Sequence, residues 1–178
     1  MPGIHPVTRI DLAFSLFCLR HRFNQQVASV SKLVSRSGDG PLYAGILLFC
    51  WYLGGDTGQA LLYAALVAFA IELPVYWLTK NSFRRRRPHE ISTLLTNFIT
   101  PSDRYSLPSG HTAAAFLMAT ILAAFFPEWI WWCYGWAALV GMSRILLGVH
   151  FLTDIVIGAL LGSACAYYGL HLMSGAMA

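Results

Sequence analysis

Long apolar segments constrain this chain more than any other feature of its sequence. Residues 59–79 and 151–173 each supply the roughly 20 mostly apolar residues with which an α-helix crosses the hydrocarbon core of a bilayer. No water inside a bilayer satisfies backbone N–H and C=O groups, so a segment of this kind must form a helix. The sequence therefore predicts an all-α fold, a polytopic membrane helical bundle.

The composition supports this class and limits the domain organisation. Hydrophobic residues make up 57% of the chain and charged residues only 11%, whereas soluble domains carry roughly 25% charged residues. Several crossings use most of the 178 residues and leave no room for a second, soluble domain. We expect one domain over residues 1–178, embedded in a membrane and without a nucleic-acid partner.

Three further apolar segments are present, at residues 42–53, 112–126 and 129–147. The segment at 42–53 supplies only about 18 Å of helix against roughly 30 Å of hydrocarbon, so it would need a turn or two from before Pro41. We predict five transmembrane helices, with six as the alternative. Residues 1–36 form an interfacial N-terminal segment, in which residues 10–26 are expected to be a short amphipathic helix.

The charged residues gather in three short strings at the ends of apolar segments. They read K-N-S-F-R-R-R-R-P at Lys80–Pro88, P-S-G-H at Pro108–His111, and S-R-I-L-L-G-V-H-F-L-T-D at Ser143–Asp154. If the crossings alternate in direction, all three strings lie on one side of the membrane. Charge this dense next to a bilayer indicates a functional site.

The connection between residues 80 and 111 is longer than the loops that join most helices. Its apolar residues Ile91, Leu94, Leu95 and Phe98 follow the i, i+3, i+4, i+7 spacing of a helix face. We expect a short surface helix there, forming one wall of an entry to the charged site.

Several residues of the three strings suit the binding of an anion. Lys80, Arg87 and Arg144 offer fixed positive charge, and the planar guanidinium fork matches phosphate oxygens. Ser109 precedes an apolar helical segment as its expected N-cap, so the N–H groups of Gly110 and His111 would point outward as an anion cradle. Gly110 has no side chain to keep an oxyanion away from the backbone.

Two histidines and one aspartate add reactive groups to these cations. His150 and Asp154 are four residues apart and can face each other at the start of the last apolar segment. The carboxylate would then fix the imidazole tautomer and raise the basicity of its other nitrogen. A second imidazole, at His111, can protonate a leaving oxygen, a step typically worth about 10² to 10⁴ in rate.

The three strings resemble the motifs of the type 2 phosphatidic acid phosphatase (PAP2) superfamily. K-x6-R-P, P-S-G-H and S-R-x5-H-x3-D occur here in the family's order over about 75 residues, with no departure from its pattern. The superfamily also includes soluble bacterial acid phosphatases and vanadium haloperoxidases. The apolar content of this chain is similar to the membrane branch, and its small size to the bacterial undecaprenyl pyrophosphate phosphatases.

The resemblance implies a role for each matching position. It implies that His150 is the nucleophile, that Asp154 orients it and that His111 protonates the leaving group. It further implies that the phosphate oxygens are bound by Lys80, Arg87, Ser109, Gly110 and Arg144. Because fixed cations stabilise the transferred group, we expect neither a metal nor a cofactor.

The implied function is that of an integral membrane lipid phosphatase that works through a phosphohistidine intermediate. Our first expectation for the reaction is undecaprenyl pyrophosphate to undecaprenyl phosphate. Phosphatidic acid, phosphatidylglycerol phosphate and lipid A are alternative substrates, and a lipid phosphotransferase is an alternative enzyme. A non-catalytic protein that binds or transports lipid phosphates is the alternative outside enzymes.

Some charged residues are left without a single interpretation by the sequence. Arg84, Arg85, Arg86 and Arg104 are typical either of contact with anionic lipids or a second phosphate, or of a topology signal. Glu72 lies inside an apolar segment, where an ionisable residue is functional by default or pairs within the bundle. The remaining histidines lack partners at motif spacing and are expected to be non-catalytic: His5, His21, His89 and His171.

The side of the membrane that carries the charged strings is predicted differently by two arguments. On the five-helix topology all 12 Lys and Arg residues lie on that side, which the positive-inside rule assigns to the cytoplasm. Bacterial membrane proteins of the family that the chain resembles usually present the site to the periplasm. We expect a multi-pass protein of the bacterial inner membrane with an external site.

Overall fold

The helices of this chain follow the apolar segments of its sequence. The computed structural model describes residues 6–20 and 24–176 and contains no strand among them, so the all-α prediction is confirmed. In chain order the elements are α1 (Pro6–Leu19), α2 (Asn24–Arg36), α3 (Gly40–Leu53), α4 (Gly55–Phe83), α5 (Pro88–Ile91), α6 (Gly110–Phe125), the 3₁₀ turn η1 (Pro127–Trp129), α7 (Ile130–Leu146) and α8 (Leu152–Ala176).

Five of these helices, α3, α4, α6, α7 and α8, coincide with the five predicted apolar segments. Two stretches are long and apolar enough to cross a membrane by themselves, residues 55–91 and residues 152–173. Helices α3 and α6 are apolar but shorter. The number of crossings therefore stays a prediction, whereas the helices themselves are present where the apolar segments predicted them.

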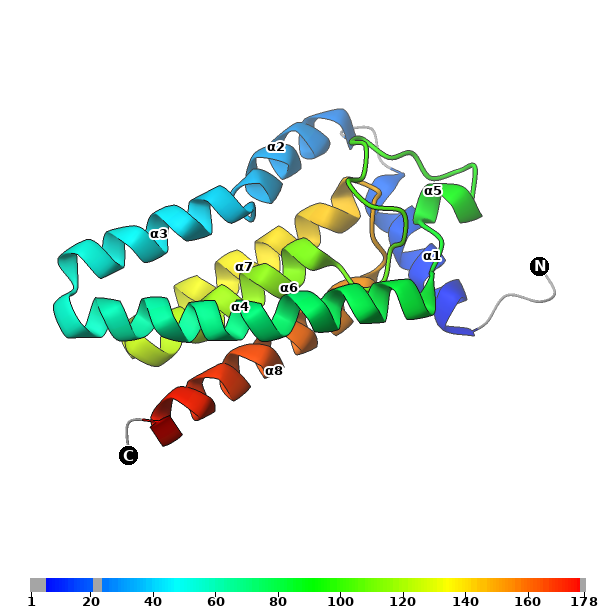
Figure 1. Ribbon diagram of the computed structural model, residues 1–178. Helices are drawn as coiled ribbons and strands as arrows, with labels where there is room; N and C mark the ends of the chain where they lie inside the picture. The colour runs from blue at the N-terminus through cyan, green and yellow to red at the C-terminus, as the bar shows by residue number, and fades with distance from the viewer. Residues whose placement is uncertain (1–5, 21–23, 177–178) are drawn as a thin grey trace.

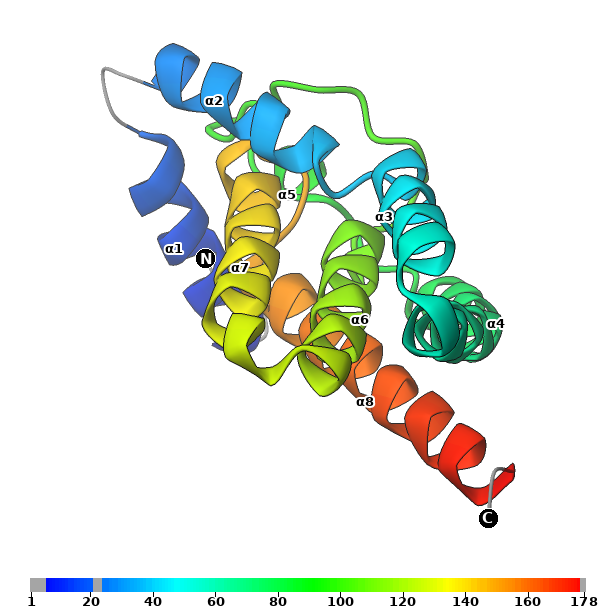
Figure 2. The ribbon, with the colours of Figure 1, turned by 90° about the vertical axis from the view of Figure 1, so that its left-hand side faces the viewer.

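Helix α6 lies in the middle of the bundle, between α7, α8 and α4 (Figure 2). Its side chains Leu117, Met118 and Ile121 are fully buried in the main apolar core. Helices α6 and α8 approach so closely that a Cβ added at Gly162 would lie 1.9 Å from the carbonyl oxygen of Ala113. Small residues at such contacts let helices in a membrane pack by van der Waals contact of their backbones.

The N-terminal segment differs from its prediction. Residues 10–26 do not form one helix, because α1 ends at Leu19 and α2 begins at Asn24. Helix α3 does not extend before Pro41 by a turn or two: it begins at Gly40, after the extended residue Asp39. The turn at Gly38 packs against α7, where a Cβ added to this glycine would lie 2.7 Å from a Val140 methyl group.

The predicted surface helix at residues 91–98 is absent. Helix α5 ends at Ile91, and the chain from residue 92 to residue 109 runs as turns and irregular backbone. The apolar residues of this connection serve tertiary contacts instead of one helix face. Leu95 is buried, and Phe98 donates a backbone hydrogen bond to the carbonyl oxygen of Leu147 (3.0 Å) and packs on the same turn.

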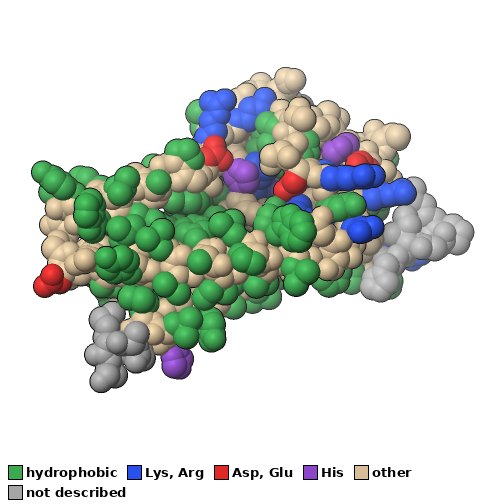
Figure 3. All heavy atoms as spheres, viewed as in Figure 1, with side chains coloured by type: hydrophobic (Ala, Val, Ile, Leu, Met, Phe, Trp, Pro, Cys, Tyr) green, Lys and Arg blue, Asp and Glu red, His purple; other side chains and the backbone are tan. Residues whose placement is uncertain are grey.

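The bundle has one polar end. Figure 1 shows α1, α5 and the 92–109 connection together at the end where α4 finishes and α8 starts, with the α3–α4 and α6–α7 turns at the other end. In Figure 3 apolar side chains cover most of the visible helices, and Lys and Arg side chains gather at the first of these ends. This arrangement brings the three charged strings to one place.

Candidate active site

Hydrogen bonds to backbone carbonyl oxygens join the three charged strings to one another. The Ser109 N–H donates to the carbonyl oxygen of Asp154 at 3.1 Å, and Arg87 Nη1 donates to the carbonyl oxygen of Val149 at 2.6 Å. All eight predicted site residues lie in this region. Those that the fold buries are Lys80, Arg87, Ser109, Arg144, His150 and Asp154, whereas Gly110 and His111 are partly exposed.

His150 lies in the short turn before α8 and faces Asp154 in the first turn of that helix. The distance from His150 Nδ1 to Asp154 Oδ2 is 3.6 Å, an ion-pair separation somewhat longer than a hydrogen bond. The same carboxylate oxygen accepts the Phe151 N–H at 2.8 Å, which fixes its orientation. Because Nδ1 faces the carboxylate, Nε2 is the nitrogen left for a reacting atom.

The protonation state of His150 suits a nucleophile. Burial lowers the pKa of His150 to about 4, and the nearby guanidinium groups of Arg87 and Arg144 act in the same direction against Asp154. Its imidazole is therefore neutral at pH 7 and carries a lone pair on one nitrogen.

His111, in the first turn of α6, forms a second histidine–aspartate pair. Its Nε2 lies 2.9 Å from Oδ1 of Asp39, the residue directly before α3. This contact crosses from one helix start to another and holds the ring at the edge of the site. It gives the second imidazole a carboxylate partner, which a proton donor or acceptor uses to keep its tautomer.

Arg144 reaches the site from the last turn of α7. Its Nη1 donates to the hydroxyl oxygen of Ser35 on α2 at 2.6 Å, so the N-terminal segment orients this guanidinium. Within the described part of the chain, its Nε is buried and has no hydrogen-bond partner. Buried donors without partners are rare in folded proteins. Arg144 lines the same cavity as His111 and His150.

A carboxylate lies between the two other predicted cations. Asp103, in the 92–109 connection, accepts from Lys80 Nζ at 2.7 Å through Oδ2 and pairs with Arg87 Nη2 through Oδ1. The Tyr76 hydroxyl donates to the same Oδ2 at 2.7 Å. Burial alone would raise the pKa of Asp103, but the hydrogen bonds from Lys80 and Tyr76 lower it below its ordinary value, so Asp103 is ionised.

The ammonium of Lys80 and the Nη atoms of Arg87 are consequently occupied by protein groups, whereas Arg87 Nε is buried and has no hydrogen-bond partner within the described residues. Lys80 Nζ also contacts the Tyr76 hydroxyl at 2.7 Å and the Pro108 carbonyl oxygen at 3.3 Å. Arg87 further donates to the carbonyl oxygens of Asp103 and Tyr105, each at 3.0 Å. The ammonium of Lys80 has only three N–H donors, and three protein groups already contact it. An anion that bound to Lys80 would therefore take the place of Asp103.

Ser109 and Gly110 occupy the predicted position at the start of a helix but differ in detail. Ser109 is the N-cap residue of α6, yet its side chain caps no backbone N–H and instead accepts a hydrogen bond from Thr112 Oγ1 at 2.9 Å. A Cβ added at Gly110 would lie 3.0 Å from the Tyr76 ring. The missing side chain thus makes room for Tyr76, and Gly110 also lines the cavity that holds His111 and His150.

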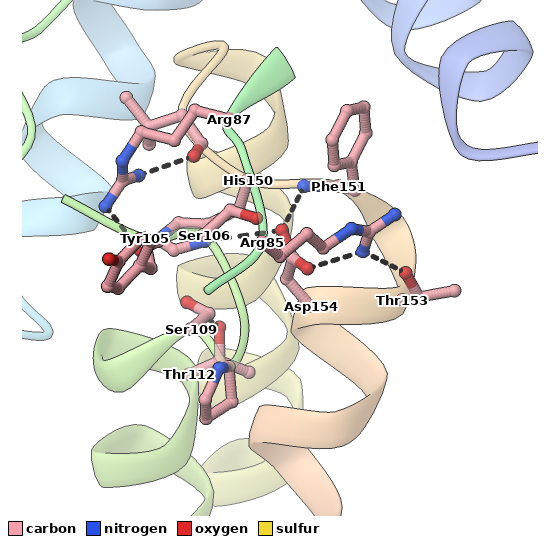
Figure 4. A network of polar contacts seen from close by, with 12 residues as sticks. Arg85, Arg87, Tyr105, Ser106, Ser109, Thr112, His150, Phe151, Thr153 and Asp154 are labelled. Carbon is pink, nitrogen blue, oxygen red and sulfur yellow. Dashed lines mark hydrogen bonds and ion pairs between the residues drawn. The ribbon is translucent and has the colours of Figure 1, made fainter. Parts of the chain in front are cut away.

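Among the four consecutive arginines, Arg85 as well as Arg87 points into the protein. Figure 4 shows Arg85 between Asp154 and Thr153, to which its Nη1 donates at 2.6 Å in each case. Its Nη2 lies 2.5 Å from Oδ2 of Asp11 on α1. Burial by itself would lower the pKa of Arg85, but Asp154 and Asp11 raise it above the ordinary value. The sequence suggested either contact with anionic lipids or a second phosphate, or a topology signal, and neither interpretation accounts for these contacts with protein groups.

The reactive groups open into an elongated cavity of about 620 Å³. One part of its lining holds His150, His111, Arg144 and Asp103, and the rest is made largely by apolar side chains of α3 and α4. Glu72 on α4 also lines this cavity and is buried, and within the described residues it has no hydrogen bond or ion pair, so the second of its two interpretations, a partner in the bundle, is not observed. A polar centre joined to an apolar groove suits an amphiphilic ligand.

The structure adds site residues that the sequence did not identify: Asp11, Ser35, Asp39, Tyr76, Asp103 and Thr153. Of these six, only Asp11 stands out in the sequence, because it is a charged residue inside an apolar segment. Arg84, Arg86 and Arg104 are exposed and line a smaller polar cavity with Glu90. His89 and His171 do not line the cavity that holds His111 and His150, and His5 and His21 lie outside the described residues.

Two curated proteins are similar to this chain in sequence. The undecaprenyl-diphosphatase of Sulfolobus acidocaldarius is 30% identical over 117 residues, which are 61% of this chain and 53% of that protein. The decaprenylphosphoryl-5-phosphoribose phosphatase of Mycobacterium tuberculosis is 37% identical over 103 residues, 56% of this chain and 51% of that one. The chain thus spans about half the length of these curated relatives.

The fold has a counterpart among solved structures. The transmembrane PAP2 type phosphatidylglycerolphosphate phosphatase from Bacillus subtilis superposes with a TM-score of 0.74, over 97% of this chain and 89% of that one, at 21% identity. That likeness establishes the fold. The family model of the PAP2 superfamily matches residues 57–177, which include all three charged strings, and the chain therefore belongs to the PAP2 superfamily.

Proposed function

We propose that this protein is an integral membrane phosphatase that hydrolyses a lipid phosphate or diphosphate through a phosphohistidine intermediate. The observation that carries the proposal is the meeting of two histidine–aspartate pairs with buried cations at one end of an apolar groove. The nucleophile His150, the proton donor His111 and two of the phosphate ligands, Gly110 and Arg144, then line one cavity.

In the first half of the reaction, Nε2 of neutral His150 attacks phosphorus and the bond from phosphorus to the leaving oxygen breaks. The leaving oxygen takes a proton from His111. The imidazole of His150 becomes cationic as the new bond forms, and the carboxylate of Asp154 next to Nδ1 stabilises that charge. Arg144 and the cations held by Asp103 stabilise the oxygens of the transferred group, so the step needs no metal.

In the second half, water attacks the phosphohistidine. His111, now neutral, accepts a proton from the water, the bond from phosphorus to His150 breaks, and inorganic phosphate leaves. The sum is substrate plus water to dephosphorylated lipid plus phosphate. For a diphosphate the leaving group is the lipid monophosphate.

The apolar part of the cavity supports a lipid substrate. Its walls are mainly α3 and α4, which also carry exposed apolar side chains (Figure 3) that would contact the membrane. A headgroup bound at His150 therefore has a continuous apolar path for its chain. Our first substrate is undecaprenyl diphosphate, since the Sulfolobus relative carries that activity in its name.

Phosphatidylglycerol phosphate is the second substrate candidate, because the Bacillus protein with the same fold acts on that lipid. We place the protein in the plasma membrane as a multi-pass protein of one domain, with the site on the external side. With that orientation, the polar end shown in Figure 1 would be the end that meets the outer water.

The test is phosphate release by the purified protein in detergent from a panel of lipid phosphates. We expect turnover of at least one of undecaprenyl diphosphate, phosphatidylglycerol phosphate, phosphatidic acid and lipid A. His150→Ala should abolish turnover and His111→Ala should lower it by about 10² to 10⁴. His171→Ala changes an exposed side chain of α8; this variant is the matched control and should keep wild-type turnover.

Three outcomes contradict parts of the proposal. Full turnover by His150→Ala would exclude the phosphohistidine route. Lipid binding with no turnover by any variant would identify a binding or transport protein. A phosphorylated acceptor in place of free phosphate would identify a transferase.

A further inference from the structure

Arg85 differs from the two arginines beside it in what it contacts. Arg84 is exposed and its Nε donates to the carbonyl oxygen of Asn81, within its own turn of chain. Arg85 instead uses both Nη atoms on buried partners from two other helices, Asp154 of α8 and Asp11 of α1. Its guanidinium also lies 4.5 Å from the ring centre of Phe151, which covers it from one side.

Each oxygen of the Asp154 carboxylate has a fixed donor. Oδ1 accepts from Arg85 Nη1 at 2.6 Å, and Oδ2 accepts from the Phe151 N–H at 2.8 Å (Figure 4). Oδ2 is also the atom that faces His150 Nδ1. If the bond to Arg85 were lost, the Phe151 N–H would be the one remaining hydrogen bond that holds this carboxylate among the contacts described, and its second oxygen would be free to turn away.

We propose that Arg85 is a positioning residue of the active site: it holds Asp154 toward His150, and Asp11 makes this possible by neutralising the charge that Arg85 brings. The inference rests on the proposed function, since it assigns Arg85 a role in supporting His150.

The charge balance explains why two carboxylates are needed. Asp11 and Asp154 are both fully buried, and buried charges are stable only when paired and hydrogen-bonded. Arg85 alone beside Asp154 would form a neutral pair and cancel the negative charge that a cationic His150 requires. With Asp11 present, the three groups carry one net negative charge next to the imidazole.

Thr153 completes the network. Its hydroxyl lies 2.5 Å from Asp11 Oδ2 and 2.6 Å from Arg85 Nη1, so it donates to the carboxylate and accepts from the guanidinium. Its backbone N–H donates to Asp11 Oδ1 at 3.1 Å. Helix α1 is thereby attached to the residue next to Asp154, although α1 lies outside residues 57–177 that match the family model.

Steady-state kinetics of Arg85→Gln, on the lipid that the wild type hydrolyses fastest, test this inference. We expect kcat to fall by about 10- to 100-fold, the usual cost of losing a contact that orients a functional ligand. KM and the inhibition constant of inorganic phosphate should stay within about twofold, because Arg85 does not face the phosphate. Arg84→Gln is the matched control and should leave kcat unchanged.

A double-mutant cycle separates positioning from a general structural role. If Arg85 acts through Asp154, Arg85→Gln should cost less than about twofold when added to Asp154→Asn, measured as single-turnover phosphate release. Arg85→Lys keeps the charge but cannot bond Asp154, Thr153 and Asp11 together, so its kcat should also fall. This variant replaces Arg85→Gln if the glutamine protein does not fold.

Asp11→Asn tests the contribution of α1, since it keeps the shape of the network and removes one charge. We expect a lower kcat with an unchanged inhibition constant for phosphate. The inference is overturned if kcat of the Arg85 variants stays within about twofold of the wild type, if only KM changes, or if the cost is fully retained in Asp154→Asn. Absence of turnover in the wild-type protein would instead count against the proposed function.

Discussion

At the scale of single residues, carboxylates decide how the charged groups of this site are arranged. Asp154 faces His150, Asp39 contacts His111, and Asp103 joins Lys80 to Arg87. Asp103 offsets the positive charge of two cations, and Asp154 and Asp39 each hold an imidazole ring that would otherwise be free. The cations predicted to bind phosphate therefore share their donors with protein groups, which gives two predictions about individual side chains.

Asp103→Asn should strengthen phosphate binding. Asp103 is ionised and competes with a phosphate for Lys80 and Arg87, so removing its charge frees these donors. We expect the inhibition constant of inorganic phosphate to fall about tenfold, equivalent to about 1.4 kcal/mol. Asp56→Asn, exposed at the opposite end of α4, is the control. Weaker phosphate binding by Asp103→Asn would show that the carboxylate orders the cations instead of competing for them.

The imidazole of His150 should stay neutral well below the pH at which free histidine titrates. Its pKa is lowered to about 4 by burial, against roughly 6.5 for an unperturbed side chain. Since the unfolded chain binds the proton more readily, folding stability is complete above about pH 6.5 and declines as the pH falls toward 4. Ring-nitrogen NMR in detergent, assigned with His150→Gln, measures this titration. A midpoint near 6.5 would contradict the burial described here.

At the scale of elements, helix packing brings the residues of the site together. Helix α6 carries His111 and α8 carries Asp154, and the two helices pack against each other directly below the site. Helix α2 orients Arg144 through Ser35, and α1 reaches Arg85 through Asp11. The two N-terminal helices thus contact functional side chains from outside the central bundle.

Gly162→Ala should destabilise the contact between α6 and α8. The added methyl group would lie 1.9 Å from the Ala113 carbonyl oxygen, which the backbone can relieve only by moving the helices apart. Overpacking of this kind costs about 1–3 kcal/mol. We expect a lower Tm in detergent and a lower kcat. Gly135→Ala on α7 is the control, because its methyl group would meet nothing within 4 Å. Equal Tm values for the two variants would contradict the close approach of the helices.

At the scale of the whole molecule, one polar end and one apolar body define how the protein sits in a bilayer. The Lys and Arg side chains gather where α4 ends and α8 begins (Figures 1 and 3). The groove between α3 and α4 runs from that end along the apolar body. A lipid can therefore present its headgroup to the site while its chain stays among apolar side chains.

Labelling of engineered cysteines tests this placement. In a variant without the four native cysteines, Arg86→Cys and Asp56→Cys place one thiol at each end of α4, both at exposed positions. We expect a membrane-impermeant maleimide added to intact cells to label Arg86→Cys, and to label Asp56→Cys only after permeabilisation. Labelling of both from one side would show that α4 does not cross. The reverse pattern would place the site in the cytoplasm.

The sequence predicted the elements well where a local property decides the structure. The helices at residues 59–79 and 151–173 follow from length and apolarity, and Ser109 was correctly placed as the residue before α6. The helix at residues 91–98 was predicted wrongly, because apolar residues at helical spacing can also make tertiary contacts, as Phe98 does with Leu147. Local spacing does not distinguish the two uses.

Alone, the sequence determined the helical class, the polar strings and their resemblance to one family, since these depend on residue type and on spacing over a few turns. The tertiary structure decided which carboxylate meets which cation or ring. Asp11 and Arg85 are separated by 74 positions, and Asp39 and His111 by 72. No periodicity links residues that far apart: only the path of the helices brings each pair within 3 Å. For the fully buried Asp11, burial then makes the pairing with Arg85 obligatory.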